Sequence, residues 1–142
     1  MPKADATSTP SKKYVGFEDL KIWQAGMDLC KDVYQATEGF VDTTPSLAAD
    51  MRSSVVNYPA SIAQSHGYRL HNSREYAHLL REARKNLTKL EIQTILAKNL
   101  GLLNGEADQL TKSIHGLTKM TNSLIRAINQ PKQPKVEMTE TE

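Results

Sequence analysis

Four histidines and a few carboxylates are the residues that metal or acid–base chemistry would use in this chain. His66, His71 and His78 are five and seven residues apart, and these spacings match no common metal-binding motif. Glu75 and His78 form a Glu-x-x-His pattern, which supplies two ligands of a di-iron centre in some helix bundles. Such a centre needs a second copy of the pattern, and the chain has none. We therefore predict no metal site, no cofactor and no catalytic residues.

Glu91 is the one carboxylate in the second half of the longest predicted helix. It lies one heptad from both Arg84 and Lys98. A carboxylate in this position is typical of an ion pair that orients packed helices, within one subunit or between two. A catalytic role would need a second polar group beside it, which the sequence does not place. We interpret Glu91 as structural.

The basic residues indicate a different chemistry, the binding of phosphate groups. The net charge is only +2, yet residues 1–51 carry −3 and residues 52–130 carry +6. A basic middle segment favours an anionic partner, although a solvated basic surface would give the same composition. The candidate nucleic-acid-binding residues are Arg52, Arg69, Arg74, Arg81, Arg84, Lys85 and Lys89. Tyr68, with His66 and His71 nearby, has the ring chemistry to stack on bases.

Most of these cations require one long helix to position them, predicted for residues 73–103. Its apolar and small residues recur at alternating steps of four and three, the stripe of a helix that packs lengthwise against others. This stripe contains Tyr76, Leu80, Ala83, Leu87, Leu90, Thr94 and Ala97. Asn72 can cap the first turn, with Glu75 in capping-box spacing, and Gly101 suits the left-handed residue after the last turn.

The first helix is predicted for residues 17–39, with Glu18 and Asp19 at its positive end and Gly39 as its C-cap. One row of its residues steps by three and four, and a second row widens the apolar face. The first row is Leu20, Trp23, Met27, Cys30, Tyr34 and Thr37, and the second is Ile22, Gly26, Leu29, Val33 and Ala36. We expect Trp23 and Cys30 to lie in the core, with the cysteine acting as a small apolar side chain.

Two further helices are predicted for residues 45–65 and 104–129. Pro59 removes the backbone hydrogen bond that the Val55 carbonyl would accept, so we expect a kink there. Gly116 in a helix interior indicates a close contact. Four amphipathic helices with short loops predict an all-α fold, an antiparallel up-down-up-down four-helix bundle. We assign residues 17–129 to the bundle, residues 1–16 to a disordered arm and residues 130–142 to a disordered tail.

The location is predicted from what the chain lacks. Its single cysteine cannot form an internal disulfide, and it has no apolar run of the length that spans a membrane. The N-terminal residues have no apolar core of the kind that a secretory signal needs. We expect a cytoplasmic protein with no membrane partner.

The long helix has more apolar surface than one bundle can cover. Ile92, Ile95 and Leu96 fall on its outer face, which is otherwise wet in a small bundle. We predict that these three residues form an oligomer interface. The alternative is that the fourth helix or the C-terminal segment folds over them.

Three segments of the chain resemble a known protein family. The spacing Phe-x-x-Leu-x-x-Trp at Phe17 to Trp23, the segment 52–65 with its Tyr-Pro-Ala-Ser-Ile-Ala core, and a third segment carry the likeness. In the third segment the matching residues are Arg69, Ser73, Glu75, Tyr76, Leu87, Leu90 and Glu91. These segments are similar to the four-helix-bundle proteins encoded within intervening sequences of large-subunit ribosomal RNA genes.

The resemblance implies a bundle that assembles into a ring, typically a homopentamer. The same fold group includes the accessory variability determinants of diversity-generating retroelements, which bind nucleic acid and a reverse transcriptase. We therefore predict a non-catalytic, oligomeric RNA-binding accessory protein. Its expected partners are RNA or an RNA–protein complex, and a reverse transcriptase is one candidate. The alternative is a structural protein–protein adaptor without nucleic-acid binding.

Overall fold

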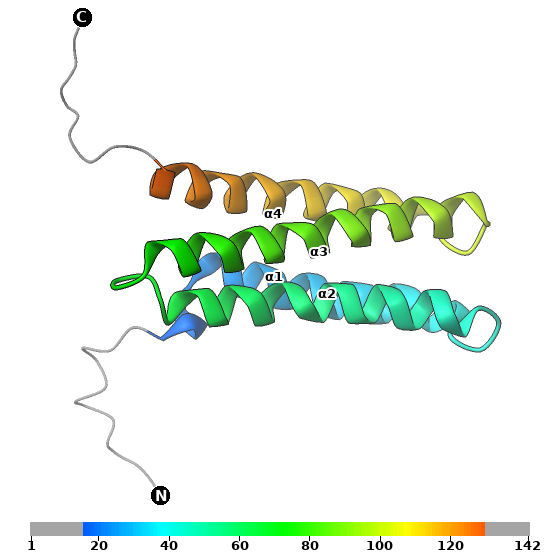
Figure 1. Ribbon diagram of the computed structural model, residues 1–142. Coiled ribbons are helices and arrows are strands. Elements are labelled where there is room, and N and C mark those ends of the chain that lie inside the picture. Colours follow the sequence, from blue (N-terminus) through cyan, green and yellow to red (C-terminus); the bar gives the residue numbers. More distant parts are fainter. Residues whose placement is uncertain (1–15, 130–142) are drawn as a thin grey trace, which may run out of the picture.

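The computed structural model describes residues 16–129, which form four long helices (Figure 1). The helices are α1 (Lys21–Thr37), α2 (Pro45–His66), α3 (Ser73–Asn99) and α4 (Gly105–Asn129). Two short 3₁₀ turns flank α1, namely η3 (Phe17–Asp19) and η4 (Glu38–Phe40). The predicted arm and tail lie outside the described residues, apart from Gly16, which is buried.

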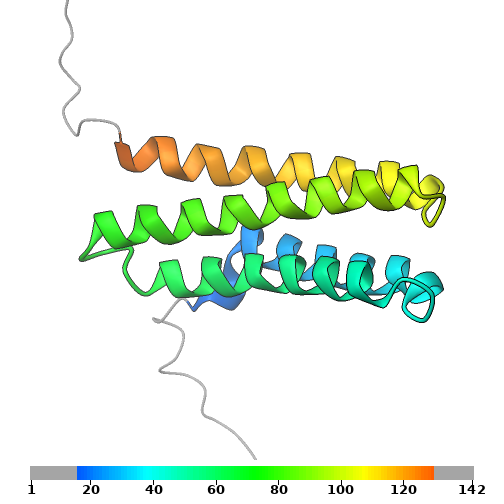
Figure 2. The same cartoon turned by 45° about the vertical axis from the view of Figure 1, so that its right-hand side comes forward.

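The helices pack in the order of the chain, and α4 closes the bundle against α1. Each helix packs against its two neighbours, while the backbones of the diagonal pairs α1–α3 and α2–α4 stay apart. The α1–α2 and α3–α4 loops lie at one end and the α2–α3 loop at the other (Figure 1). Figure 2 shows α3 lying between α2 and α4. The all-α, up-down-up-down bundle is therefore confirmed.

The helix ends of α3 follow the predicted signals. The Asn72 side chain accepts a hydrogen bond from the Glu75 amide at 3.0 Å. Gly101 has a φ of 77°, the left-handed conformation that lets the chain leave the helix. The α3 stripe from Leu80 to Ala97 is buried, as predicted, and Tyr76 is half-buried.

The start of α1 differs from the prediction. Leu20 is extended (φ −77°, ψ 126°) and separates η3 from α1, so Glu18 and Asp19 belong to the turn and not to the first turn of α1. Phe17 folds back and its ring meets Trp23 edge-on, with 5.2 Å between ring centroids. Gly39 lies inside η4, and so it is not a left-handed cap.

The core face of α1 consists of most of the second predicted row together with Cys30 and Thr37 of the first. Gly26 and Val33 are buried, whereas Met27 and Tyr34 are each 44% exposed, so the prediction for those two residues was wrong. A Cβ atom on Gly26 would lie 2.9 Å from the Tyr58 ring. The absence of that atom lets α2 approach this face of α1, which turns Met27 and Tyr34 outward.

Helix α2 continues through Pro59 to His66. The Val55 carbonyl, which has no backbone donor because of Pro59, accepts a hydrogen bond from the buried Cys30 thiol at 3.3 Å. Burial raises the pKa of Cys30 to about 11, so the thiol keeps the proton that it donates. Cys30 lies in the core, as predicted, and it also has this polar role.

The predicted close contact at Gly116 is wrong, since a Cβ atom there would meet no atom within 4 Å. Gly116 is exposed, over a shallow groove between α1 and α4. The close approach that a glycine allows occurs instead at Gly26.

Replacing each of these two glycines with alanine should change stability in opposite directions. Gly116→Ala should raise the free energy of unfolding by about 1 kcal/mol, because alanine favours the helix and meets no neighbour. Gly26→Ala should lower it by about 1–2 kcal/mol, because the overlap with the packed Tyr58 ring exceeds the same helical gain. Urea unfolding at one protein concentration measures both. A stabilised Gly26→Ala variant would contradict the tight α1–α2 contact.

Candidate nucleic-acid interface

A row of four exposed cations follows the outer face of α3. Arg74, Arg81, Lys85 and Lys89 are spaced by seven, four and four residues, which keeps them on one stripe of a helix. We call these four residues the basic stripe. Lys85 forms an exposed ion pair with Glu82 at 3.1 Å, a kind of contact that contributes little energy. Among residues 16–129, Arg74, Arg81 and Lys89 have no hydrogen-bond or ion-pair partner.

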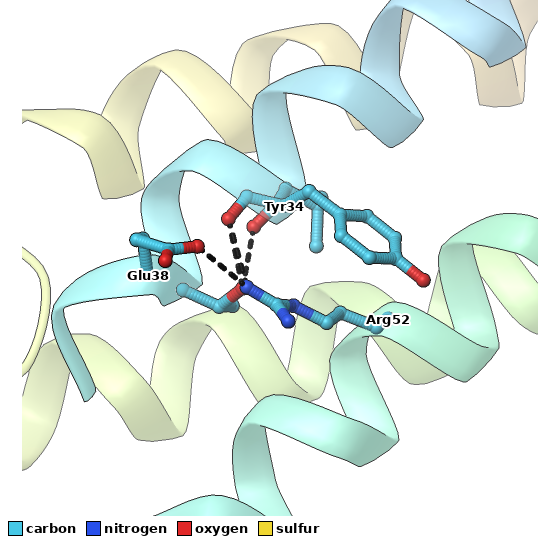
Figure 3. A network of polar contacts seen from close by, with 5 residues as sticks. Tyr34, Glu38 and Arg52 are labelled. Carbon is cyan, nitrogen blue, oxygen red and sulfur yellow. Dashed lines mark hydrogen bonds and ion pairs between the residues drawn. The ribbon is translucent and has the colours of Figure 1, made fainter. Parts of the chain in front are cut away.

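Arg52 lies apart from the basic stripe and holds the end of α1 (Figure 3). Its Nε donates to Thr37 Oγ1 at 2.7 Å, and one terminal nitrogen donates to the Tyr34 carbonyl at 3.1 Å. The same nitrogen pairs with Glu38 at 3.3 Å, and the guanidinium lies 4.5 Å from the centre of the Tyr34 ring. The bond to Tyr34 supplies a donor to a carbonyl in the last turn of α1, where a positive charge is also favourable. A role for Arg52 in binding nucleic acid stays a prediction.

Arg84 is half-buried and points toward α4, where it donates to the Asn122 side chain at 2.8 Å. This contact is one of three polar contacts between α3 and α4. Glu91 Oε2 lies 2.7 Å from His115 Nε2, and Lys98 Nζ lies 3.1 Å from Asp108 Oδ1. Glu91 thus orients helices, as interpreted, but its partner is a histidine of α4 that the sequence reasoning did not pair with it. Arg84 turns away from the basic stripe.

Arg69 is in the exposed turn between α2 and α3. It lies at the edge of a cavity of about 580 Å³, to which all four helices contribute. In the same turn, the Tyr68 and His71 rings lie 6.0 Å apart at a tilt of 46°. The turn therefore brings a cation and two rings to the end of the bundle where α3 and the basic stripe begin.

The opposite end of α3 is exposed and apolar. Ile92 is 62% exposed and Ile95 and Leu96 are nearly half exposed, so α4 does not cover them. Leu100, which the sequence reasoning did not include, is 57% exposed beside them. We call these four residues the apolar end. Their predicted role in an oligomer interface stays a prediction.

The described part of the chain offers no metal centre: no three His, Cys, Asp or Glu side chains in it converge on one point. Its helices are also not apolar enough over a sufficient length to span a bilayer.

Replacing Arg52 should destabilise the bundle, whereas replacing a residue of the basic stripe should not. Arg52→Gln should lower the free energy of unfolding by about 1–2 kcal/mol, because Thr37 and the end of α1 lose charged hydrogen bonds. Arg81→Gln removes the same charge without a partner and should change it by less than about 0.5 kcal/mol. Thermal or urea unfolding compares the two variants. Equal stabilities would contradict the structural role of Arg52.

Comparison with known proteins places the chain in a family. No curated protein gives a significant match. A family model described as 23S rRNA-intervening sequence protein matches residues 18–123, which include all of α1, α2 and α3 and most of α4. The match covers well over half of the chain and contains the basic stripe and the apolar end. The chain therefore belongs to the 23S rRNA-intervening sequence protein family.

Proposed function

We propose that this protein is a non-catalytic accessory protein that binds structured RNA through the basic stripe of α3. The observation that carries this proposal is the exposure of four aligned cations, three of which have no partner among residues 16–129. Cations that make no internal contact are free to neutralise phosphates. The description of the family, which refers to ribosomal RNA, supports RNA as the anion.

The geometry of the basic stripe suits a phosphate backbone. From Arg74 to Lys89 the helix rises by about 22 Å, at about 1.5 Å per residue. A row of this length contacts several phosphates and releases their counterions on binding, so affinity falls as salt rises. Such contacts carry little sequence information, which fits recognition of RNA by its shape.

The protein acts as an oligomer in this proposal, with the apolar end as one side of the subunit interface. A ring needs two different surfaces on each subunit, since each copy contacts its neighbours in a head-to-tail manner. Exposed Tyr34 and Val56 line a groove between α1 and α2 and offer a second apolar surface. The number of subunits, five in the proteins that the sequence resembles, remains part of the proposal.

The biological setting has two forms in this proposal. The RNA is ribosomal, or it belongs to a retroelement whose reverse transcriptase is a further partner. The second candidate function is a protein–protein adaptor, and the exposure of the apolar end favours it, because a protein partner would cover that surface as well as a second copy would.

Neutralising part of the basic stripe tests the RNA assignment. The triple variant Arg81→Gln, Lys85→Gln and Lys89→Gln should bind a structured RNA more weakly and reduce the slope of log affinity against log salt by up to about three units. The matched control replaces Lys21, Lys31 and Lys112, three exposed cations outside the stripe, with Gln. Fluorescence anisotropy across a salt series measures both variants. Equal slopes for the two triple variants would refute this surface, and no binding of wild type at low salt would favour the adaptor.

A charge placed on the apolar end tests the interface. Ile95→Asp should dissociate the oligomer, because a carboxylate would be buried without a partner between subunits. The side chain is 48% exposed in one subunit, so the helical circular dichroism of the subunit should be retained. Light scattering after size exclusion gives the mass. A variant with the mass of the wild-type assembly would show that the interface lies elsewhere.

A further inference from the structure

The cavity beside Arg69 is open to solvent and is lined mainly by apolar side chains from the four helices. Its lining residues come from the end of the bundle that carries the α2–α3 loop. Leu20 and Ile22 contribute from the start of α1, Ile62 from α2, and Leu80 from α3. A volume of about 580 Å³ is in the range of pockets that hold small organic groups.

The polar groups of this cavity can donate hydrogen bonds and attract an anion. Its lining includes Arg69, Tyr76, Ser65 and Ser123, and it includes no carboxylate. The Ser65 hydroxyl donates to the Ile62 carbonyl at 2.7 Å, so among these Arg69, Tyr76 and Ser123 are the donors left for a ligand. Burial raises the pKa of Tyr76, an effect that the positive charge of Arg69 partly opposes, so at neutral pH the phenol is protonated and can donate. The cavity therefore combines apolar walls and an aromatic ring with a cation. Its charge favours an anionic ligand over a cationic one.

The cavity and the basic stripe lie at the same end of α3 but on different sides of that helix. Arg74 begins the basic stripe, and Tyr76, two residues later, lines the cavity. Arg69, in the turn that precedes α3, lines the cavity five residues before Arg74. We expect an RNA backbone that continues past Arg74 and over this turn to meet Arg69 at the edge of the cavity.

We propose that the cavity receives the base of an unpaired nucleotide in the bound RNA, with Arg69 on the adjacent phosphate. The inference rests on the proposed RNA binding and specifies the class of RNA, one with a bulged or looped-out nucleotide. Unpaired bases are recognised by stacking on aromatic rings and by hydrogen bonds to their edges, and the Tyr76 ring and the hydroxyls of Tyr76 and Ser123 have the chemistry for both. A fully paired duplex cannot present a base in this way.

Two RNA hairpins that differ by one bulged nucleotide test this inference with the full-length protein. The bulged base is 2-aminopurine, whose fluorescence reports its environment. The wild-type protein should bind the bulged hairpin roughly tenfold tighter than the paired one, since stacking of a single base supports a factor of this order. The 2-aminopurine emission should change on binding. Equal affinity for the two hairpins would overturn the inference and leave the proposed RNA binding intact, whereas binding to neither hairpin would overturn both.

Two variants assign the effect to the cavity. Ser123→Trp fills the cavity from an exposed position on α4, and it should abolish the tenfold preference without changing affinity for the paired hairpin. The matched control is Ser46→Trp, at an exposed position at the other end of the bundle, which should keep the preference. Arg69→Gln in the exposed turn should also reduce the preference. A preference that survives both Ser123→Trp and Arg69→Gln would place the bulged base elsewhere and refute the assignment.

Discussion

The way in which the bundle accommodates Pro59 determines how its first two helices pack. Pro59 leaves the Val55 carbonyl without its backbone donor in the interior, and an unpaired buried carbonyl costs free energy. The Cys30 thiol supplies the missing donor from α1. One turn before Cys30, Gly26 leaves room for the Tyr58 ring. Two constraints on one face of α1 therefore fix its rotation, and Met27 and Tyr34 lie outside as a consequence.

Polar contacts link the packed α1–α2 pair to α4, and α4 to α3. The Tyr58 hydroxyl forms a buried hydrogen bond of 2.8 Å with Thr121, which ties α2 to the opposite helix across the core. From there, three polar contacts set the register of α4 against α3. They join Arg84 to Asn122, Glu91 to His115, and Lys98 to Asp108, at steps of seven residues that run in opposite directions on the two helices. Only one antiparallel register satisfies all three, so the outward direction of the basic stripe follows from the packing on the other side of α3.

The sequence predicted the features that residues of a single helix determine. It did not predict the contacts that depend on how a neighbouring helix packs. The Asn72 cap, the left-handed Gly101 and the exposed Ile92 each follow from residues within a few turns of one helix. The identity of the tight glycine required knowing which glycine faces Tyr58, and no periodicity within α1 or α4 contains that information. The charge of Arg52 was evident, but its nearness to Thr37 arises only when α1 packs on α2.

The outer face of α3 changes from basic to apolar within one turn, between Lys89 and Ile92. If the apolar end joins copies of the chain, as proposed, each added subunit contributes another basic stripe held rigidly by the same helix. Contacts from several stripes to one RNA then act as linked binding events, whose combined affinity exceeds that of any single stripe. One stripe of four cations, with salt screening at physiological ionic strength, gives only weak binding by itself. RNA affinity and assembly are therefore coupled through α3, because the helix that carries the charges also carries the surface that would bring several sets of charges together.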